Sequence, residues 1–278
     1  MDIEPMESDL PVVYQIDLRG REIFLHWFMY IIGGFYNLSH LPKPVKFHVQ
    51  ITQLFQRETL PLLAPDYEYV ENIEGYKVVQ HPGTPYPPPT TGDPIEYFQF
   101  VRNQIVFKNN LDRKEPPFRR LYFRRSNAHY FPHHQGRALR HIQEEDKLVA
   151  VLEKNGYECL FLEHYTLLEK IKLFQEAELV VSPNGGALTG CYFAHKDTKV
   201  VIITPPTTAV TQYVDLCKAL SVDYTCYDHL KCFNKHGIEI HNYPMCYEYT
   251  MKILDYAHLL QYLESIKPSN VRLETSTY

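Results

Sequence analysis

The sequence of 278 residues has no uninterrupted apolar run of about 18 residues, the length that a helix needs to cross a bilayer. Its most apolar early stretch, Ile23 to Phe35, is interrupted by His26, Gly33 and Gly34. Residues 1–9 are acidic and lack the basic start of a secretory signal. The sequence therefore predicts a soluble protein without a membrane span, located in the cytoplasm.

Cysteine and net charge are also limited. Six cysteines in a chain without a secretion signal predict free thiols in a reducing compartment. No C-x-x-C pair occurs, and the Cys/His-rich stretch from Cys226 to Cys246 matches no standard zinc module, so we expect an ordinary loop or hairpin there. A net charge of -5 argues against nucleic acid as the partner of the whole chain.

Three common catalytic signatures are missing as well. The chain contains no G-x-G-x-x-G, no G-x-x-x-x-G-K-[ST] and no G-x-S-x-G. A dinucleotide fingerprint, a P-loop and the nucleophile turn of an α/β-hydrolase are therefore not supported. The hydrophobic fraction of 45%, with 22 tyrosines and 15 phenylalanines, nevertheless predicts a well-formed core.

Proline divides the chain. Residues 81–94 contain six prolines, which neither a helix nor a central strand tolerates, and a second polar break spans residues 109–117. We place a domain boundary near residue 110, which gives one domain in residues 1–110 and a second in residues 111–278. In the first domain we expect strands at 12–17, 45–51 and 76–80, and helices at 22–38, 52–63 and 95–107.

The second domain alternates between apolar strands and amphipathic helices, which predicts a parallel sheet covered on both faces. Thr166 and Glu169 form a capping box that opens one of these helices. The expected strands are 120–124, 158–162, 179–181, 199–204 and 223–227. The expected helices are 138–154, 166–177, 186–193, 208–220 and 251–266.

The segment from Leu179 to Thr189 carries the clearest chemical signal. An apolar strand ends there, a glycine turn follows, and a short helix begins. Glycine lets the backbone approach a ligand, and the free N–H groups of a new helix favour a diphosphate. The alternative is a tight turn that binds nothing. The candidate donor-binding residues in this segment are Ser182, Asn184, Gly185, Gly186, Ala187 and Thr189.

A basic stretch follows the first strand of the same domain. Arg124, Arg125 and Ser126 stand at its carboxyl end, and Arg137 comes shortly after. The guanidinium group donates hydrogen bonds in pairs, which suits phosphate, so we add these residues to the candidate donor site. The alternative is a solvated basic loop.

These motifs, in this order and spacing, resemble glycosyltransferase family 61, which includes plant xylosyltransferases and protein O-GlcNAc transferases. The similarity extends from Leu121 to Tyr224 and is fainter around His26-Trp27. Asn184 stands where the family usually has histidine, and Gly190 where it has asparagine. The segments that carry the resemblance are Arg124-Arg125, Arg137 to His141, Gly156 to Glu158, Thr166 to Ala177 and Val180 to Gly190.

The resemblance implies an α/β fold of the GT-B type, in which two Rossmann-like domains face a cleft. Here the N-terminal, acceptor-side domain would be reduced, and residues 111–278 would bind the nucleotide sugar. It also implies inverting transfer from a UDP-sugar, with UDP-xylose as the first guess, to a glycan acceptor without a required metal or other cofactor. A setting in bacterial surface-polysaccharide synthesis, or in glycan synthesis by a large virus in its host's cytoplasm, fits such a chain.

An inverting transfer needs a base that takes the proton of the acceptor hydroxyl. The candidates are His26, whose ordinary pKa lies near neutrality, and Asp93 in the proline-rich connection. Each also has a structural interpretation, as a packed helical histidine and as a helix cap. Two other functions stay open: a nucleotide- or sugar-binding module without turnover, and another nucleotide-dependent α/β enzyme such as a methyltransferase.

Overall fold

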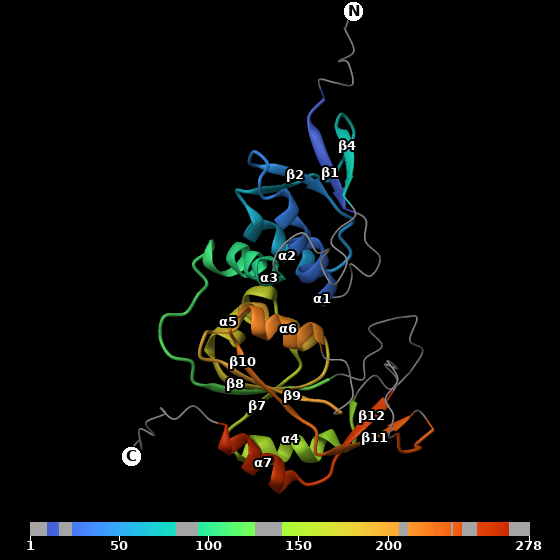
Figure 1. Ribbon diagram of the computed structural model, residues 1–278, viewed down its shortest axis with the longest axis vertical. Coiled ribbons are helices and arrows are strands. Elements are labelled where there is room, and N and C mark those ends of the chain that lie inside the picture. The colour runs from blue at the N-terminus through green and yellow to red at the C-terminus, as the bar shows by residue number, and fades with distance from the viewer. Residues whose placement is uncertain are drawn as a thin grey trace, which may run out of the picture.

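The computed structural model describes residues 10–16, 24–81, 94–125, 141–205, 211–234, 236–240 and 249–266. Two parallel sheets follow one another along the long axis of the molecule, with helices between them (Figure 1). The expectation of an α/β fold with parallel sheets is confirmed. No helix within the described ranges is long and apolar enough to cross a membrane.

The first sheet contains four parallel strands, in the order β3 (Tyr67–Tyr69), β2 (Val45–His48), β1 (Val12–Ile16) and β4 (Lys77–His81). A continuous helical passage precedes β2, made of α1 (Phe24–His26), the π-helix η2 (Trp27–Ile32) and the 3-10 helix η3 (Gly33–Leu38). The later helices of this half are α2 (Leu54–Leu63), α3 (Pro94–Arg102) and the π-helix η4 (Asn103–Phe107).

The second sheet contains five parallel strands, in the order β10 (Asp223–Tyr227), β9 (Lys199–Ile203), β8 (Ala177–Pro183), β5 (Arg119–Phe123) and β7 (Glu158–Leu160). Its long helices are α4 (Glu145–Lys154), α5 (Leu167–Glu176), α6 (Thr211–Ala219) and α7 (Tyr256–Ser265). In Figure 1, α5 and α6 lie on the face toward the first sheet, and α4 and α7 on the opposite face. The central strand β8, and β9 after its first residue, are thereby buried on both faces, as their apolar sequences predict.

A third, smaller sheet lies beside the second. Its strands are β11 (Leu230–Asn234), β12 (Tyr249–Ile253) and β6 (His141–Ile142), with β11 antiparallel and β6 parallel to β12. Two expectations were wrong here, because the predicted helix 138–154 includes the strand residues of β6, and the predicted helix 251–266 begins with residues of β12. The helix α4 starts only after Glu144, whose φ of 54° breaks helical geometry, and α7 starts after its cap at Asp255.

Most other elements were predicted correctly, within a few residues at their ends. The capping box before α5 is confirmed: Thr166 N donates to Glu169 Oε2 at 2.8 Å, and Glu169 N donates to Thr166 Oγ1 at 3.3 Å. The boundary predicted near residue 110 falls in the connection between η4 and β5. The division into two domains stays a prediction.

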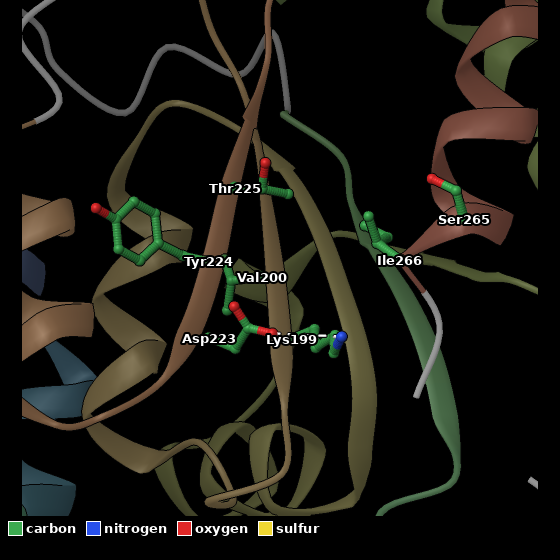
Figure 2. A pocket seen from close by; sticks show the side chains of 7 residues that line it. All are labelled: Lys199, Val200, Asp223, Tyr224, Thr225, Ser265 and Ile266. Atoms are coloured by element: carbon green, nitrogen blue, oxygen red, sulfur yellow. Dashed lines mark ion pairs between the residues drawn. The ribbon is translucent and has the colours of Figure 1, made fainter. Parts of the chain in front are cut away.

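A hollow of about 220 Å³ opens at the amino ends of β9 and β10 (Figure 2). Lys199 and Asp223, the first residues of these strands, form an ion pair there at 3.4 Å. The remaining lining residues are Val200, Tyr224, Thr225, Ser265 and Ile266. Ligands of open α/β sheets bind at the carboxyl ends of the strands, so this hollow is not the expected place for a donor.

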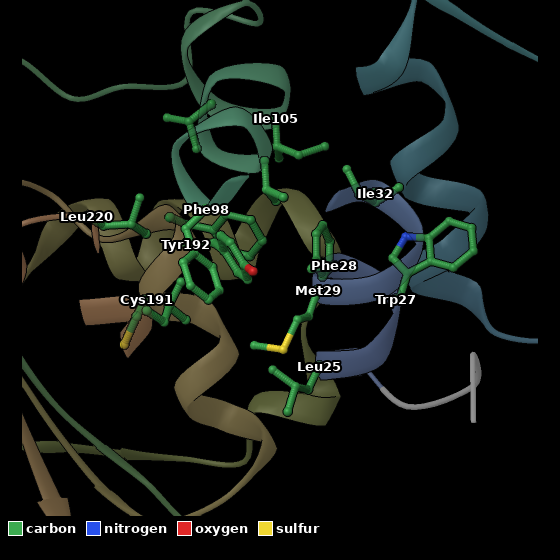
Figure 3. Packing of buried hydrophobic residues seen from close by; sticks show 14 of the residues in the cluster. Leu25, Trp27, Phe28, Met29, Ile32, Phe98, Ile105, Cys191, Tyr192 and Leu220 are labelled. Atoms are coloured by element: carbon green, nitrogen blue, oxygen red, sulfur yellow. The ribbon is translucent and has the colours of Figure 1, made fainter. Parts of the chain in front are cut away.

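One buried cluster joins the two halves of the chain, and its centre is the 3-10 helix η7 (Gly186–Phe193). Phe28 of η2 packs edge-on against Phe193, with ring centroids 5.3 Å apart. The rings of Tyr192 and Phe98 of α3 have centroids 6.1 Å apart, and Figure 3 shows Phe28, Phe98 and Tyr192 between the helices. The helices of the first sheet therefore cover the helix that follows the glycine turn.

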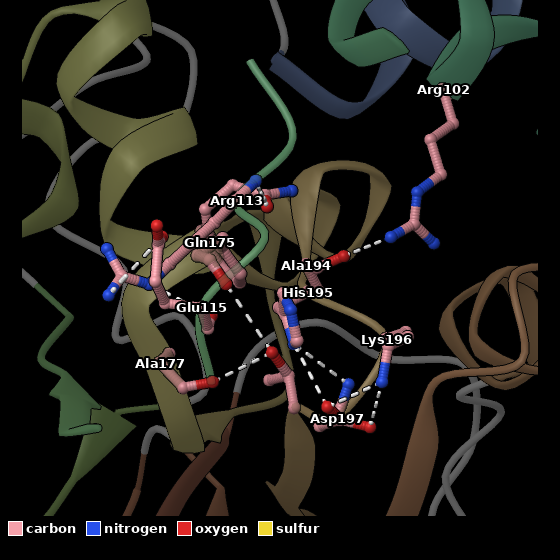
Figure 4. A network of polar contacts seen from close by, with 11 residues as sticks. Arg102, Arg113, Glu115, Gln175, Ala177, Ala194, His195, Lys196 and Asp197 are labelled. Atoms are coloured by element: carbon pink, nitrogen blue, oxygen red, sulfur yellow. Dashed lines mark hydrogen bonds and ion pairs between the residues drawn. The ribbon is translucent and has the colours of Figure 1, made fainter. Parts of the chain in front are cut away.

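Polar groups tie the same elements together (Figure 4). The buried guanidinium of Arg102, in α3, donates to the carbonyl of Ala194 after η7 and, at 3.3 Å, to that of Leu220 after α6. Gln175 of α5 donates to the carbonyl of Phe193 at 2.5 Å and accepts from the backbone N–H of Arg113 at 2.7 Å. These contacts satisfy carbonyls that the helix ends leave without an intrahelical partner.

Helix η7 packs so closely on α5 that Gly190 has no room for a side chain. A Cβ at this position would lie 1.9 Å from Cε2 of Phe174. Because Phe174 is fully buried, we expect Gly190→Ala to lower the free energy of unfolding by roughly 1–3 kcal/mol. Chemical denaturation measures this loss.

The matched control is Gly186→Ala in the same helix, since a Cβ at Gly186 meets nothing within 4 Å. Its stability should stay within about 0.5 kcal/mol of the unchanged protein. If the two variants lose the same free energy of unfolding, the contact with Phe174 does not restrict the side chain at residue 190.

Candidate functional site

The glycine turn lies at the carboxyl edge of the second sheet. All residues of β8 are buried, and the chain leaves the strand at Asn184, enters the turn at Gly185 and begins η7 at Gly186. Asn184 N donates to the carbonyl of Ile203 at 3.0 Å, which holds the turn against the end of β9. The first N–H groups of η7 therefore lie at the edge where ligands of such sheets bind.

The guanidinium of Arg125 lies directly on this turn. Its Nη1 donates to the carbonyl of Asn184 at 3.1 Å. A Cβ at Gly185 would lie only 2.2 Å from the same Nη1. The backbone of Gly185 is extended, with φ 172°, so a side chain here would not strain the backbone but would displace the guanidinium of Arg125. The structure thus brings together two groups that the sequence suggested separately, because β5 and β8 are adjacent parallel strands.

Arg124 makes different contacts. Its Nη2 donates to Asp146 Oδ1 at 2.6 Å, and its Nε lies 3.5 Å from Glu145 Oε2. The guanidinium also lies over the ring of Phe161, 4.6 Å from the centroid. Two carboxylates at the start of α4 therefore balance most of its charge. A role for Arg124 in donor binding stays a prediction, and it would require the donor to compete with these ion pairs.

The polar side chains of the turn are buried. Ser182 is 1% exposed, and its hydroxyl donates to the carbonyl of Pro183 at 3.0 Å. Asn184 Oδ1 and Thr189 Oγ1 are buried without a hydrogen-bond partner among the described residues. A buried polar atom without a partner costs about 1–3 kcal/mol, so water or a ligand is expected to supply one here.

Three residues that the sequence analysis did not select lie beside Arg125. Glu145 Oε1 accepts a hydrogen bond from Tyr122 OH at 2.7 Å and one from Arg125 N at 3.4 Å. Burial raises the pKa of the Tyr122 phenol well above its ordinary value, so it stays protonated and donates. His141 feels the charges of both Glu145 and Arg125. The sequence did not reveal this grouping, because Glu145 contacts Tyr122 and Arg125 only through the fold, and His141 belongs to β6 and not to the predicted helix 138–154.

The structure describes only one of the two candidate bases. His26 ends α1, and its half-buried ring packs against Tyr30 with centroids 5.0 Å apart. Because α1 packs against η7, His26 belongs to the layer that covers the helix after the turn. Its neighbour Trp27 is fully buried and donates its indole N–H to Thr59 Oγ1 at 3.1 Å, so that ring is no platform for a sugar. Asp93, Ser126 and Arg137 lie outside the described residues.

The Cys/His-rich stretch is part of the sheets. Cys226 is an exposed residue of β10, and Cys232 is fully buried in β11. Within the part of the chain that the structure describes, no group of three or more His, Cys, Asp or Glu side chains is arranged to hold a metal ion. His241 and Cys246 lie outside that part.

His141 makes this edge sensitive to acid. Burial lowers the pKa of its imidazole, Arg125 adds to this effect, and Glu145 opposes it. Below its ordinary pKa of about 6.5, the unfolded chain therefore binds more protons at this position than the folded protein, so acidification lowers the free energy of unfolding. We expect His141→Asn to lose less stability between about pH 7 and pH 5 than the unchanged protein.

Denaturant titrations at the two pH values measure this difference. His236→Asn, which replaces an exposed imidazole, is the control. If His141→Asn and the unchanged protein lose the same free energy of unfolding on acidification, His141 does not cause the loss.

Comparison with known proteins identifies the family of this chain. The glycosyltransferase 61 family model matches residues 24–201. A dodecameric, iron-containing heptosyltransferase, TibC, solved in complex with ADP-D-β-D-heptose, matches with 13% sequence identity and a TM-score of 0.38. That match covers 83% of this chain and 64% of the heptosyltransferase. No curated protein matches the sequence significantly. Since the family model covers well over half of the chain, from α1 to β9, and includes Arg125 and the glycine turn, the chain belongs to glycosyltransferase family 61.

Proposed function

We propose that this protein is a glycosyltransferase that moves a sugar from a nucleotide-sugar donor to a hydroxyl group of a glycan acceptor. Membership of family 61 supports the class of reaction. The observation that carries the proposal for this chain is the guanidinium of Arg125 on the carbonyl of Asn184, in a space that exists because Gly185 has no side chain. A cation fixed beside a helix start is suited to bind a diphosphate.

The leaving group of such a transfer is a nucleoside diphosphate, on which negative charge grows as the bond to the sugar breaks. A guanidinium can bond a backbone carbonyl and phosphate oxygens together, since it carries several N–H donors in a plane. The N–H groups of Gly186 and Ala187 at the start of η7 would supply further donors. Charge stabilisation of this kind favours the transition state, because it is strongest when the diphosphate departs.

The proposed reaction inverts the anomeric carbon. The acceptor oxygen attacks this carbon from the side opposite the diphosphate, the carbon–oxygen bond to the diphosphate breaks, and a base takes the hydroxyl proton. His26 and Asp93 are the proposed bases. The donor that we propose is a UDP-sugar, with UDP-xylose first, and we propose that Arg125 and the turn stabilise the diphosphate without a divalent cation. Ser182, Asn184 and Thr189 complete the proposed donor site, together with Arg124, Ser126 and Arg137.

A second candidate is a module that binds a nucleotide sugar without turnover. The observation that favours it is Asn184, which stands where the resembled pattern has histidine and whose Oδ1 is buried without a described partner. Donor binding is common to both candidates, whereas release of free nucleotide diphosphate in the presence of acceptor belongs to the enzyme alone. An assay for UDP release with a panel of glycan acceptors therefore separates them.

The donor site predicts a specific thermal response. We expect UDP and one UDP-sugar, with or without Mg²⁺, to raise the melting temperature, because a ligand at about 100 times its Kd adds about 2.7 kcal/mol of stability. Arg125→Ala should greatly reduce the shift, since it removes the cation from the turn and leaves only the N–H groups of η7 as donors. A melting scan against nucleotides, UDP-sugars, S-adenosylmethionine and nicotinamide nucleotides measures this.

The matched control is Arg119→Ala. Arg119 begins the strand that Arg125 follows, and it pairs with Glu158 and Glu176 at the opposite edge of the sheet. Its loss should leave the ligand-induced shift intact. If no uridine nucleotide shifts the melt, the UDP assignment is wrong, and a shift with S-adenosylmethionine would point to a different enzyme class.

A further inference from the structure

We propose that Glu145 is a positioning residue of the donor site, which holds the backbone of Arg125 so that its guanidinium stays on the glycine turn. This inference rests on the proposed function. A carboxylate and a diphosphate repel each other, so the charge of Glu145 alone does not suggest a role in a site expected to bind an anion.

Glu145 is the first residue of α4, and its side chain is only 12% exposed. Its Oε1 accepts from the backbone N–H of Arg125 at 3.4 Å and from the phenol of Tyr122 at 2.7 Å. Its Oε2 lies 3.5 Å from Nε of Arg124. The carboxylate therefore contacts both arginines that follow β5, one through its backbone and the other through its side chain.

The phenol makes the position of this carboxylate rigid. Tyr122 is fully buried within β5, and burial raises its pKa well above the ordinary value, so it remains a hydrogen-bond donor at neutral pH. A short bond from a core residue fixes the Glu145 side chain in one conformation. Side chains locked by such second-layer contacts hold a functional group within the narrow geometry that binding requires.

Arg125 is thereby held at two points. Its backbone N–H is bonded to Glu145, and its Nη1 is bonded to the carbonyl of Asn184 at 3.1 Å. The contacts run from Tyr122 in β5 through Glu145 in α4 to the turn after β8. Ordering a long arginine side chain costs conformational entropy, and a backbone fixed in advance reduces what the ligand must offset on binding.

The same carboxylate separates the roles of the two arginines. Arg124 pairs with Glu145 and with Asp146, so its guanidinium is directed to the start of α4. Arg125 is directed to the turn. In the absence of the Glu145 charge, Arg124 would lose one of its two carboxylate partners, and the backbone between the two arginines would lose its anchor.

The test measures UDP affinity of the full chain by calorimetry. Glu145→Gln keeps the size of the side chain and removes its charge, and we expect UDP to bind severalfold more weakly, because the contact with Arg125 N, at 3.4 Å, is longer than a strong charge-assisted hydrogen bond. Because Glu145 acts through Arg125, adding Glu145→Gln to Arg125→Ala should cause no further loss. This non-additivity is a readout that a purely structural role would not produce.

Glu178→Gln is the matched control. Glu178 is also a buried carboxylate on this sheet, 2.7 Å from Nε of Arg120, but it lies near the amino ends of the strands. Glu178→Gln should lower the melting temperature and leave UDP affinity unchanged. If Glu145→Gln does not fold, Tyr122→Phe replaces it, and a smaller loss of UDP affinity, again absent in the Arg125→Ala background, is expected.

Two outcomes overturn the inference in different ways. If the unchanged protein and Arg125→Ala both fail to bind UDP, the proposed function fails, and the inference fails with it. If the unchanged protein binds UDP and Arg125→Ala binds it much more weakly, while Glu145→Gln binds normally, only the inference is wrong. Equal losses from Glu145→Gln with and without Arg125 would also overturn it, because the carboxylate would then act independently.

Discussion

The position of η7 is the constraint on which the rest of this molecule depends. Its beginning forms the glycine turn, its aromatic side chains pack against η2 and α3, and the carbonyl of Ala194 after its end accepts a hydrogen bond from Arg102. Gly190 lets it approach Phe174 of α5 without a side chain between them. Residues from both halves of the chain therefore contact the same short helix, and these contacts also fix the position of the glycine turn at its start.

Charged groups come together at one edge of the second sheet, because strand ends and a helix start meet there. The carboxyl ends of β5 and β8 are neighbours, so Arg125 reaches the turn directly, and α4 begins close enough for Glu145 to bond the backbone of Arg125. A site built on strand ends and helix starts needs few flexible elements. Preorganised donors of this kind cost little reorganisation when charge develops on a leaving group.

Much of the architecture was predictable, because it follows from local patterns. Buried strands such as β9 read as continuous apolar runs, and the Thr166 capping box marks the start of α5 in the sequence itself. The glycine turn was predictable for the same reason. The helix predicted over 138–154 was wrong at His141 and Ile142, which form β6. The helix predicted over 251–266 was wrong at its beginning, since Tyr249, Met251 and Ile253 alternate with less buried residues as a strand does. That alternation of period two was the signal that should have separated β12 from α7.

The contacts of the candidate site were harder to predict. Nothing local in the sequence distinguishes Arg124 from Arg125, and only the fold shows that one pairs with the start of α4 and the other with the turn. Glu145 appeared as one acidic residue among several in a predicted helix, a pattern typical of solvated surfaces. Its role depends on Tyr122, whose burial in β5 is a tertiary property.

A crystal structure of the protein with UDP would show directly whether Arg125 and the glycine turn bind the diphosphate. We predict that the diphosphate lies at the carboxyl edge of the second sheet, bonded to the guanidinium of Arg125 and to the N–H groups of Gly186 and Ala187. A diphosphate bound away from that turn, for example in the hollow beside Lys199 and Asp223 at the opposite edge, would contradict it.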